Sequence, residues 1–201
     1  MAQPKDFTAD VNFLFEMGSV RFISRMWHRF LGGDFANLAD HHFRMYWIAM
    51  VIAEHEGADI NTVGKMVMVH DISESRAGDV DYLARQYVER NEQLAITDML
   101  RGTAVEAEFL GIWQQYEDRT SLEAKVAKDA DNLDVDFELA EQAASGWPLK
   151  ARWQDNRRFV AAEKLYTQTA KQIFAALETA DPHAWHLISR RNRRNGGDWQ
   201  K

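Results

Sequence analysis

Apolar residues recur at helical spacing along most of the chain, whereas the alternation typical of strands is nearly absent. Gly57 and Gly146-Trp147-Pro148 interrupt this pattern, and residues 73–81 around Gly78 predict an irregular connection. The pattern predicts helices over residues 8–31, 37–56, 59–72, 82–101, 104–116, 121–145 and 150–179, with a short last helix that starts at Asp181-Pro182. The predicted fold is all-α, a single compact bundle of about seven or eight helices.

The length of 201 residues fits one domain with a substantial core. We expect residues 1–191 to form this domain, and the polar, glycine-containing residues 192–201 to be a frayed tail. Hydrophobic residues make up 46% of the chain and charged residues 27%, which is the balance of a folded globular protein rather than a disordered one.

Composition also limits where the protein works. No window approaches the roughly 18 consecutive apolar residues that a membrane span needs, and residues 1–10 lack the basic start and apolar stretch of a signal peptide. The sequence contains no cysteine, which excludes disulfides, thiolate metal sites and a cysteine nucleophile. We therefore expect a cytoplasmic protein with no membrane partner.

The charge balance argues against nucleic acid as the main partner. The chain has 24 basic and 31 acidic residues and a net charge of −7, so it has no general attraction for a polyanion. The basic run at Arg190, Arg191, Arg193 and Arg194 is predicted to be a solvated helix end. A small anionic substrate remains compatible with this charge, because a metal ion and one or two arginines can reverse the sign inside a pocket.

The first candidate functional residues are a histidine and an aspartate at the end of a predicted apolar helix. Val67-Met68-Val69 leads directly into His70-Asp71, and such polar groups are costly to bury unless they are paired or bind a metal. Adjacent helical residues point about 100° apart, so other elements must complete the shell of any shared ion. The sequence should therefore supply further ligands on other helices.

Two other predicted helices supply them. His41 lies on the same helix face as Met45 and Ile48, and Asp131 lies one turn from Val135 inside the long predicted helix. Two histidines and two aspartates form a set of nitrogen and oxygen ligands that suits Mn²⁺, Co²⁺, Fe²⁺ or Zn²⁺, and Mg²⁺ also stays open. With four protein ligands, an octahedral ion keeps about two positions for water or substrate. Each residue alone would more often be a hydrogen-bonded core residue, and only the combination predicts a metal site.

This combination resembles the H…HD…D signature of the HD-domain metal-dependent phosphohydrolases. The closest resemblance is to the branch that contains the HD-domain 5′-deoxynucleotidases, and it covers about residues 10–170. The strings that carry it are Ala39-Asp40-His41-His42-Phe43-Arg44-Met45, Val69-His70-Asp71-Ile72-Ser73-Glu74, Gly78-Asp79-Val80 and residues 124–131. The resemblance implies an HD-type helical bundle that hydrolyses a nucleoside 5′-monophosphate, preferably a deoxy one, to nucleoside and phosphate.

The resemblance also implies roles for two further carboxylates. It makes Glu74 the residue that positions or deprotonates the attacking water, and Asp79 a proton donor or a contact to the leaving group. Without the resemblance, Glu74 would be interpreted as a solvent-facing helix end and Asp79 as a turn or capping residue. A bound divalent ion would lower the pKa of water from about 16 toward 7 and neutralise phosphate charge.

Substrate contacts follow the family pattern less closely. The family places an Arg-Trp pair before the first metal histidine, and here Met26-Trp27 occupies those positions. Either Arg25 or Arg29 could supply the guanidinium that binds phosphate. Trp27 could stack on a base, crowd the sugar 2′-position or belong to the core. Lys128 matches a family lysine and is expected to reach the phosphate.

Several alternatives stay open. The loop Gly32-Gly33-Asp34-Phe35-Ala36 lacks the Arg and Glu that family members commonly carry there, so the preference for deoxy over ribo substrates is not fixed. The substrate could instead be a nucleoside triphosphate or a sugar phosphate, or the chain could be an inactive module that retains metal; Glu74 and Asp79 favour catalysis. A homodimer is implied by the resemblance alone. His42 is predicted to be either polar surface or a second layer around the metal.

Overall fold

The computed structural model of the chain describes residues 5–31 and 36–188, and these residues form helices joined by turns and one isolated bridge between Ser24 and Asn37. Eight helices have nine residues or more: α1 (Thr8–Ser19), α3 (Leu38–Glu56), α4 (Ile60–Val69), α6 (Glu92–Leu100), α7 (Glu106–Asp118), α8 (Leu122–Ala144), α9 (Leu149–Glu163) and α10 (Gln168–Leu177). The shorter elements are α2 (His28–Leu31), α5 (Glu74–Ala77), α11 (Ala184–Leu187) and the 3₁₀ turns Val20–Phe22 and Ala84–Gln86. Within the described residues, the prediction of an all-α bundle is confirmed.

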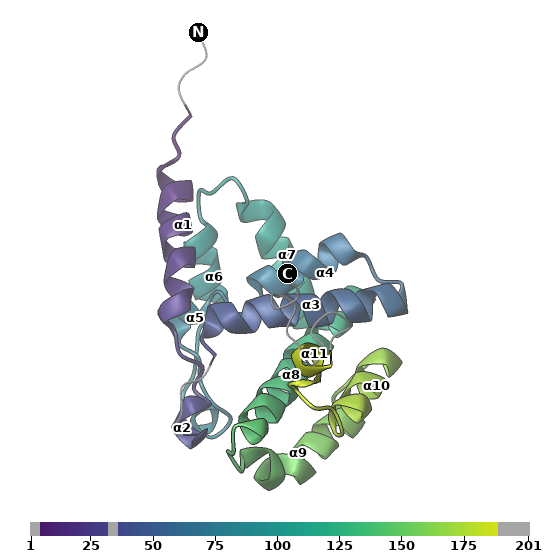
Figure 1. Cartoon of the computed structure of the whole chain (residues 1–201). Helices are drawn as coiled ribbons and strands as arrows, with labels where there is room; N and C mark the ends of the chain where they lie inside the picture. Colours follow the sequence, from purple (N-terminus) through teal and green to yellow (C-terminus); the bar gives the residue numbers. More distant parts are fainter. Residues whose placement is uncertain (1–4, 32–35, 189–201) are drawn as a thin grey trace, which may run out of the picture.

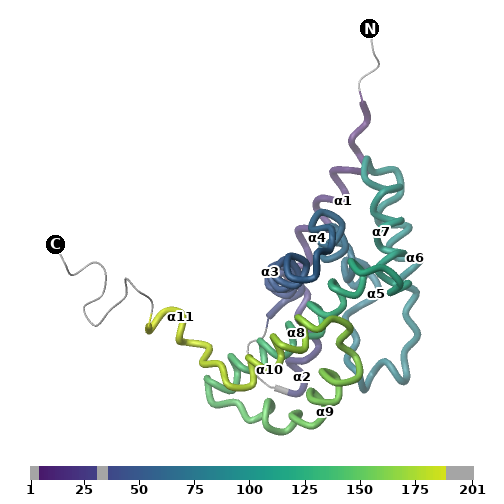
Figure 2. Tube along the Cα trace, turned by 90° about the vertical axis from the view of Figure 1, so that its right-hand side faces the viewer, coloured from purple at the N-terminus to yellow at the C-terminus, as the bar shows by residue number. Residues whose placement is uncertain are grey.

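Helix α8 is the centre of the bundle. It packs against α3, α4 and α7, and further along its length against α9 and α10. Figure 1 shows α3 crossing the middle of the molecule, α1 beside α6, and α9 and α10 together at the opposite end. Figure 2 shows α11 projecting from the bundle after α10.

The core lies where α3, α4 and α8 meet. Met45, Ile52, Val63, Met66 and Leu133 have no exposed surface there, and burial of such side chains is the main force that holds the helices together. The fold places the start of α3, the end of α4 and the middle of α8 next to one another.

The helix predicted over residues 8–31 is interrupted after Ser19 and resumes only as the short α2. After a 3₁₀ turn the chain becomes extended, and Ile23 and Arg25 pair with the segment before α3. The Leu38 N–H donates to the Ile23 carbonyl at 2.8 Å, and the Arg25 N–H donates to the Ala36 carbonyl at 3.3 Å. Backbone partners from the other segment thus replace the helical bonds.

Two other predicted helices are shorter than expected. Helix α6 begins only at Glu92, where the Asn91 side chain accepts a hydrogen bond from the Leu94 N–H at 2.9 Å. The predicted helix over 150–179 is two helices, because the backbone between them turns to donate to the carboxylate of Asp129 on α8. The predicted connection over 73–81 contains one helical turn, α5.

Some predictions lie outside the described residues: the Gly32-Gly33-Asp34-Phe35 part of the loop before α3, the basic run from Arg190 to Arg194, and the tail over 192–201. Among the residues that are described, none of the helices combines the length and apolar character needed to cross a membrane.

Candidate metal centre

The four predicted metal ligands come together from three segments of the chain. His41 lies in the first turn of α3, His70 and Asp71 directly follow α4, and Asp131 lies in the middle of α8. One ligand atom from each residue lies within 4.8 Å of the others. Both histidines are buried, and both aspartates are partly buried. In the described part of the chain, this is the one group of histidine and carboxylate side chains arranged to hold a metal ion.

The local structure fixes where His41 points. Asn37 caps α3, its side chain accepting from the Asp40 N–H at 3.0 Å. His41 follows one turn later, facing α8, and its Nδ1 donates to Asp134 Oδ2 at 2.7 Å. This bond leaves Nε2 directed toward the other ligands.

The ring of His70 is held in the same way. Its Nδ1 lies 2.8 Å from the Val67 carbonyl oxygen, which can only accept a hydrogen bond, so Nδ1 carries the proton. The two Nε2 atoms of His41 and His70 consequently face each other at 3.2 Å.

The atoms around this point have the chemistry of a cation site. His70 Nε2 lies 3.1 Å from Asp71 Oδ2, and His41 Nε2 lies 3.5 Å from Asp131 Oδ1. Two imidazole nitrogens and two carboxylates all offer electron pairs to the space between them, which a divalent metal ion would accept. The residues present therefore fit such an ion.

The carboxylates of the cluster attract positive charge even when no metal is bound. Burial opposes protonation of His70, but the carboxylates of Asp71 and Asp131 and the Val67 carbonyl together outweigh it and raise the pKa of His70. Burial alone would raise the pKa of Asp71, yet His70 and Arg25 hold it well below its usual range. In this way the Arg25 guanidinium supplies some of the positive charge that an ion would bring.

A second layer of residues supports the ligands. Asp134 receives a second hydrogen bond from Arg44 Nε at 2.5 Å, and the other two Arg44 nitrogens bond Glu138 and Glu141 at 2.6 Å each. His42 is buried with its ring centroid 4.8 Å from that of His70. Its predicted position on the polar surface is therefore wrong, and its ring packs against that of His70.

Glu74 is buried beside this centre. Only 7% of the residue is exposed, so the alternative prediction of a solvent-facing helix end is wrong. Its Oε1 accepts from Arg90 at 3.1 Å, whereas Oε2 has no hydrogen-bond partner. Burial, together with repulsion from Asp71 and Asp79, raises the pKa of Glu74 to about 9. The carboxyl therefore holds a proton readily and has one oxygen free for a ligand.

Asp79 and Arg25 form a buried pair next to Glu74. Asp79 Oδ2 accepts from the Met26 N–H at 3.2 Å and lies 3.5 Å from Arg25 Nε. Arg25 NH1 lies 3.3 Å from Asp71 Oδ2 and 3.8 Å from Glu74 Oε2. Asp79 thus fixes the extended segment that brings Arg25 to the centre.

The structure separates the two arginines that were candidates for the phosphate contact. Arg29 pairs with Asp81 at 2.9 Å and its side chain is 47% exposed, whereas the Arg25 side chain is 12% exposed. Arg25 therefore supplies the guanidinium at this centre.

A cavity of about 610 Å³ opens over the cluster, within the size range of small-molecule sites. One wall is aromatic: Trp27, Tyr82 and Trp153 line it, and the Trp27 and Trp153 ring centroids are 4.9 Å apart. Lys128 also lines the cavity, and its Nζ lies 2.6 Å from Asp131 Oδ2. Trp27 belongs to this wall, partly buried rather than enclosed in the core.

Sequence reasoning missed several residues of this site. Asp134 lies three residues after Asp131, so helical periodicity could have identified it as facing the same way. Arg90 and Trp153 gave no comparable signal, because both fell inside predicted helices whose true ends differ.

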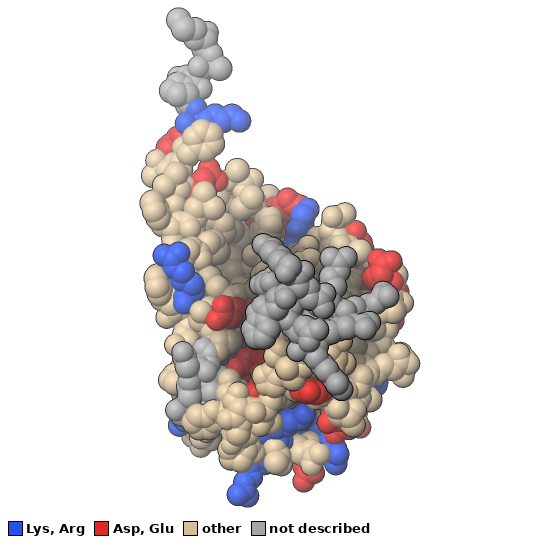
Figure 3. Space-filling view, viewed as in Figure 1, with Lys and Arg blue, Asp and Glu red and all other residues tan. Residues whose placement is uncertain are grey.

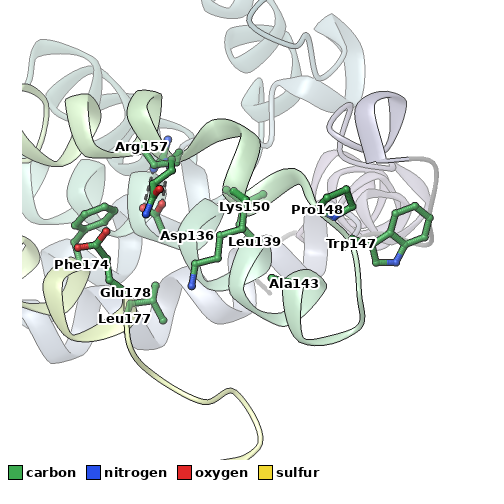
Figure 4. A pocket seen from close by; sticks show the side chains of 12 residues that line it. Asp136, Leu139, Ala143, Trp147, Pro148, Lys150, Arg157, Phe174, Leu177 and Glu178 are labelled. Atoms are coloured by element: carbon green, nitrogen blue, oxygen red, sulfur yellow. Dashed lines mark hydrogen bonds and ion pairs between the residues drawn. The ribbon is translucent and has the colours of Figure 1, made fainter.

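A second cavity, of about 270 Å³, lies between α8, α9 and α10. Figure 4 shows its side chains, with Asp136 and Arg157 joined by hydrogen bonds and Leu139, Phe174 and Leu177 among its apolar lining. Its buried charges, Asp136 and Arg157, are paired with each other.

Comparison with known proteins agrees with this geometry. Residues 17–174 match a family model described as HD domain. The chain is 31% identical over 118 residues to a 5′-deoxynucleotidase of Dictyostelium discoideum, which covers 52% of this chain and 62% of that protein. It is 27% identical over 110 residues to a human 5′-deoxynucleotidase, covering 52% and 53% respectively. The chain thus spans little more than half the length of the curated relatives that it matches.

Solved structures share the fold. A conserved hypothetical protein from Pyrococcus furiosus superimposes with a TM-score of 0.69 at 23% identity, covering 85% of this chain and 99% of that one. A predicted metal-dependent phosphohydrolase from Magnetospirillum magnetotacticum gives a TM-score of 0.68 at 22% identity, covering 85% and 92%. At these identities the likeness concerns the fold alone.

Proposed function

The chain belongs to the HD-domain family, and from that premise we propose that it is a metal-dependent phosphomonoesterase that hydrolyses nucleoside 5′-monophosphates. The observation that carries this proposal is the convergence of His41, His70, Asp71 and Asp131 at one point. This point lies at a cavity that is also lined by Glu74, whose Oε2 has no hydrogen-bond partner. We propose residues 1–191 as the domain that performs the reaction, acting in the cytoplasm.

We propose that the four converging side chains hold a divalent ion. When bound, such an ion would lower the pKa of a water molecule and offset phosphate charge. Glu74, whose Oε2 has no hydrogen-bond partner, is placed to orient the attacking water. The positive charge of a bound ion would favour the ionised form of this carboxyl, which could then take the proton of the water. Arg25 and Lys128 bind the phosphate oxygens by charge-assisted hydrogen bonds. Asp79 keeps Arg25 oriented and lies within reach of the leaving group, where it makes a contact or delivers a proton.

The aromatic wall supports a nucleoside as the other half of the substrate. Trp27, Tyr82 and Trp153 offer apolar ring surface beside a charged centre, and nucleobases stack well on such rings. The relatives from Dictyostelium and human are 5′-deoxynucleotidases, and we propose a deoxynucleoside monophosphate as the preferred substrate, with the base or the sugar 2′-position against Trp27.

We also propose a homodimer. The exposed face of α1 carries Leu14 and Phe15, 66% and 77% exposed, and α3 exposes Phe43 and Trp47. Figure 3 shows a mostly uncharged surface along α1. Apolar surface of this kind is common where subunits meet.

One assay tests the function. Protein stripped of metal and reloaded with Mn²⁺ or Co²⁺ is given a panel of deoxy- and ribonucleoside monophosphates, triphosphates and sugar phosphates, and free phosphate is measured. We expect release from deoxynucleoside monophosphates, and none from the stripped protein. Release from triphosphates or sugar phosphates alone would identify a different ester as the substrate. No release from any ester, with metal still bound, would show an inactive binding module.

A further inference from the structure

Arg119 has an unusual backbone conformation at the rim of the cavity. It ends α7 with φ 54° and ψ 22°, in the left-handed region. The other described residues with positive φ are glycines, at positions 57, 78, 102 and 146. A side chain is disfavoured in this region, and glycine is the usual residue after a helix end. The sequence thus keeps an arginine at a position where glycine would be less strained.

The side chain of Arg119 turns back over the wall of the cavity. Its Cζ lies 3.5 Å from the centroid of the Tyr116 ring, a cation–π contact. Tyr116 is buried, and its ring centroid lies 5.4 Å from that of His70. Arg119 therefore sits one ring away from a proposed metal ligand, and it lines the same cavity as Lys128.

The guanidinium of Arg119 has fewer partners than the other buried cations there. Its NH2 lies 3.5 Å from Glu117 Oε1, and its buried NH1 has no hydrogen-bond partner. The other partly or fully buried cations of the cavity each donate to a carboxylate at 3.3 Å or less: Arg25 to Asp71, Arg90 to Glu74, Lys128 to Asp131 and Arg157 to Asp136. Arg119 therefore keeps hydrogen-bonding capacity for a ligand.

We propose that Arg119 is an anion-binding residue of the cavity and that it binds the phosphate group of the substrate. This inference rests on the proposed function. A phosphate offers several acceptor oxygens, and a planar guanidinium can donate two parallel hydrogen bonds to them. Binding would supply the acceptor that the guanidinium lacks. A side chain needed for binding also explains why a strained conformation is kept at this position.

The test is Arg119→Gly in the full-length, metal-loaded protein, with inorganic phosphate as the probe in isothermal calorimetry. Losing a charge-assisted contact should weaken phosphate binding by about tenfold or more. Because glycine suits the left-handed region, we expect the variant to melt at or above the temperature of the wild type, and Arg119→Ala to melt below Arg119→Gly. Metal content should equal that of the wild type.

Two further variants define the control. Arg119→Lys keeps the charge without the planar fork and should bind phosphate with an affinity between wild type and Arg119→Gly. Arg101→Ala removes an exposed arginine that pairs with Asp98 at 2.6 Å and does not line the cavity, and should change phosphate binding by less than about twofold. Phosphate binding by Arg119→Gly as tight as that of the wild type overturns the inference.

The outcomes separate this inference from the proposed function. A wild type that hydrolyses nucleoside monophosphates, with an Arg119→Gly variant that binds phosphate normally, contradicts only the role of Arg119. A wild type that binds phosphate through Arg119, but releases none from any monophosphate, contradicts only the proposed function.

Discussion

Helix α8 carries two kinds of buried aspartate a few residues apart. Asp129 is fully buried and accepts hydrogen bonds from the Tyr166 N–H, the Thr167 N–H and the Thr167 hydroxyl, each at 2.7 Å. Asp136 accepts two bonds from Arg157 at 2.8 Å each. In this region the protein supplies every donor, so the carboxylates join α8 to the segments that follow it.

Asp131, between those two residues, lies in a different environment. Lys128 is its one close donor, while His41 Nε2 at 3.5 Å and the Asp71 carboxylate share the same space. Around Asp131, nitrogen and carboxylate lone pairs therefore face one another with few hydrogen-bond donors between them. Burial of a carboxylate therefore does not by itself indicate function. A buried carboxylate indicates function where its neighbours lack the hydrogen-bond donors that burial requires.

Asp71→Ala should give the largest effect, because it removes one of the converging ligands. We expect the variant to lose bound metal and to lose at least about a thousandfold in phosphate release. Metal content by elemental analysis and activity against a deoxynucleoside monophosphate are the measurements.

The matched control is Asp98→Ala, which removes an aspartate that pairs with Arg101 on the surface at 2.6 Å. It should retain metal and activity. An Asp71→Ala variant that keeps its metal would show that the cluster is a hydrogen-bonded core like the region around Asp129. Asp131 would then not differ in kind from Asp129.

Glu74→Gln should have the next largest effect, because Glu74 has an oxygen without a hydrogen-bond partner but is not one of the four proposed ligands. Glutamine keeps the oxygen that accepts from Arg90 but cannot take a proton from water. We expect unchanged metal content and a fall in kcat of about 10²- to 10⁴-fold, with KM little changed. Steady-state kinetics on the metal-loaded protein measure both.

Glu92→Gln is the control for that variant, since Glu92 also pairs with Arg90, at 2.6 Å. Its kcat should stay within about threefold of the wild type. Loss of metal in Glu74→Gln would instead make Glu74 a ligand and place it with Asp71 and Asp131.

The proposed metal ligands were accessible to sequence reasoning because His41 and Asp131 lie on helices among apolar neighbours and His70-Asp71 directly follows the apolar end of α4. The choice between Arg25 and Arg29 was not. In one continuous helix these residues would share a face, four positions apart. The extended pairing of Ser24 with Asn37 breaks the helix and directs the two arginines to different carboxylates, Asp79 and Asp81.

Other failures have the same cause, contacts between residues far apart in the sequence. The break between α9 and α10 depends on Asp129, which lies 37 residues before Tyr166. Local periodicity contains no trace of such a partner, so it continued the helix through the break. The conformation of Arg119 is equally invisible, because no glycine marks the turn.

Asp129→Ala tests whether Asp129 has a structural role alone. It leaves the N–H groups of Tyr166 and Thr167 without their acceptor, and should lower the free energy of unfolding by about 2–4 kcal/mol. Metal content of the folded protein should be unchanged, because Asp129 touches no proposed ligand. Urea unfolding and elemental analysis are the measurements. Metal loss from a still-folded Asp129→Ala would mean that the two regions of α8 do not act independently.

Asp134→Asn should give the smallest effect, because Asp134 shares features with both the structural aspartates and the aspartates of the proposed metal site. It is satisfied by Arg44 and His41, yet through His41 it acts on the proposed metal site. Asparagine keeps an oxygen that can accept from His41 Nδ1, so the ring should stay oriented, but the lost negative charge makes the imidazole a weaker ligand. We expect metal affinity, measured by competition with a chelator, to fall by about 10- to 100-fold. Glu138→Gln, which changes another carboxylate on Arg44 at 2.6 Å, should leave affinity within about twofold. If Asp134→Asn binds metal as tightly as the wild type, packing alone orients His41, and Asp134 belongs with Asp129 among the structural aspartates.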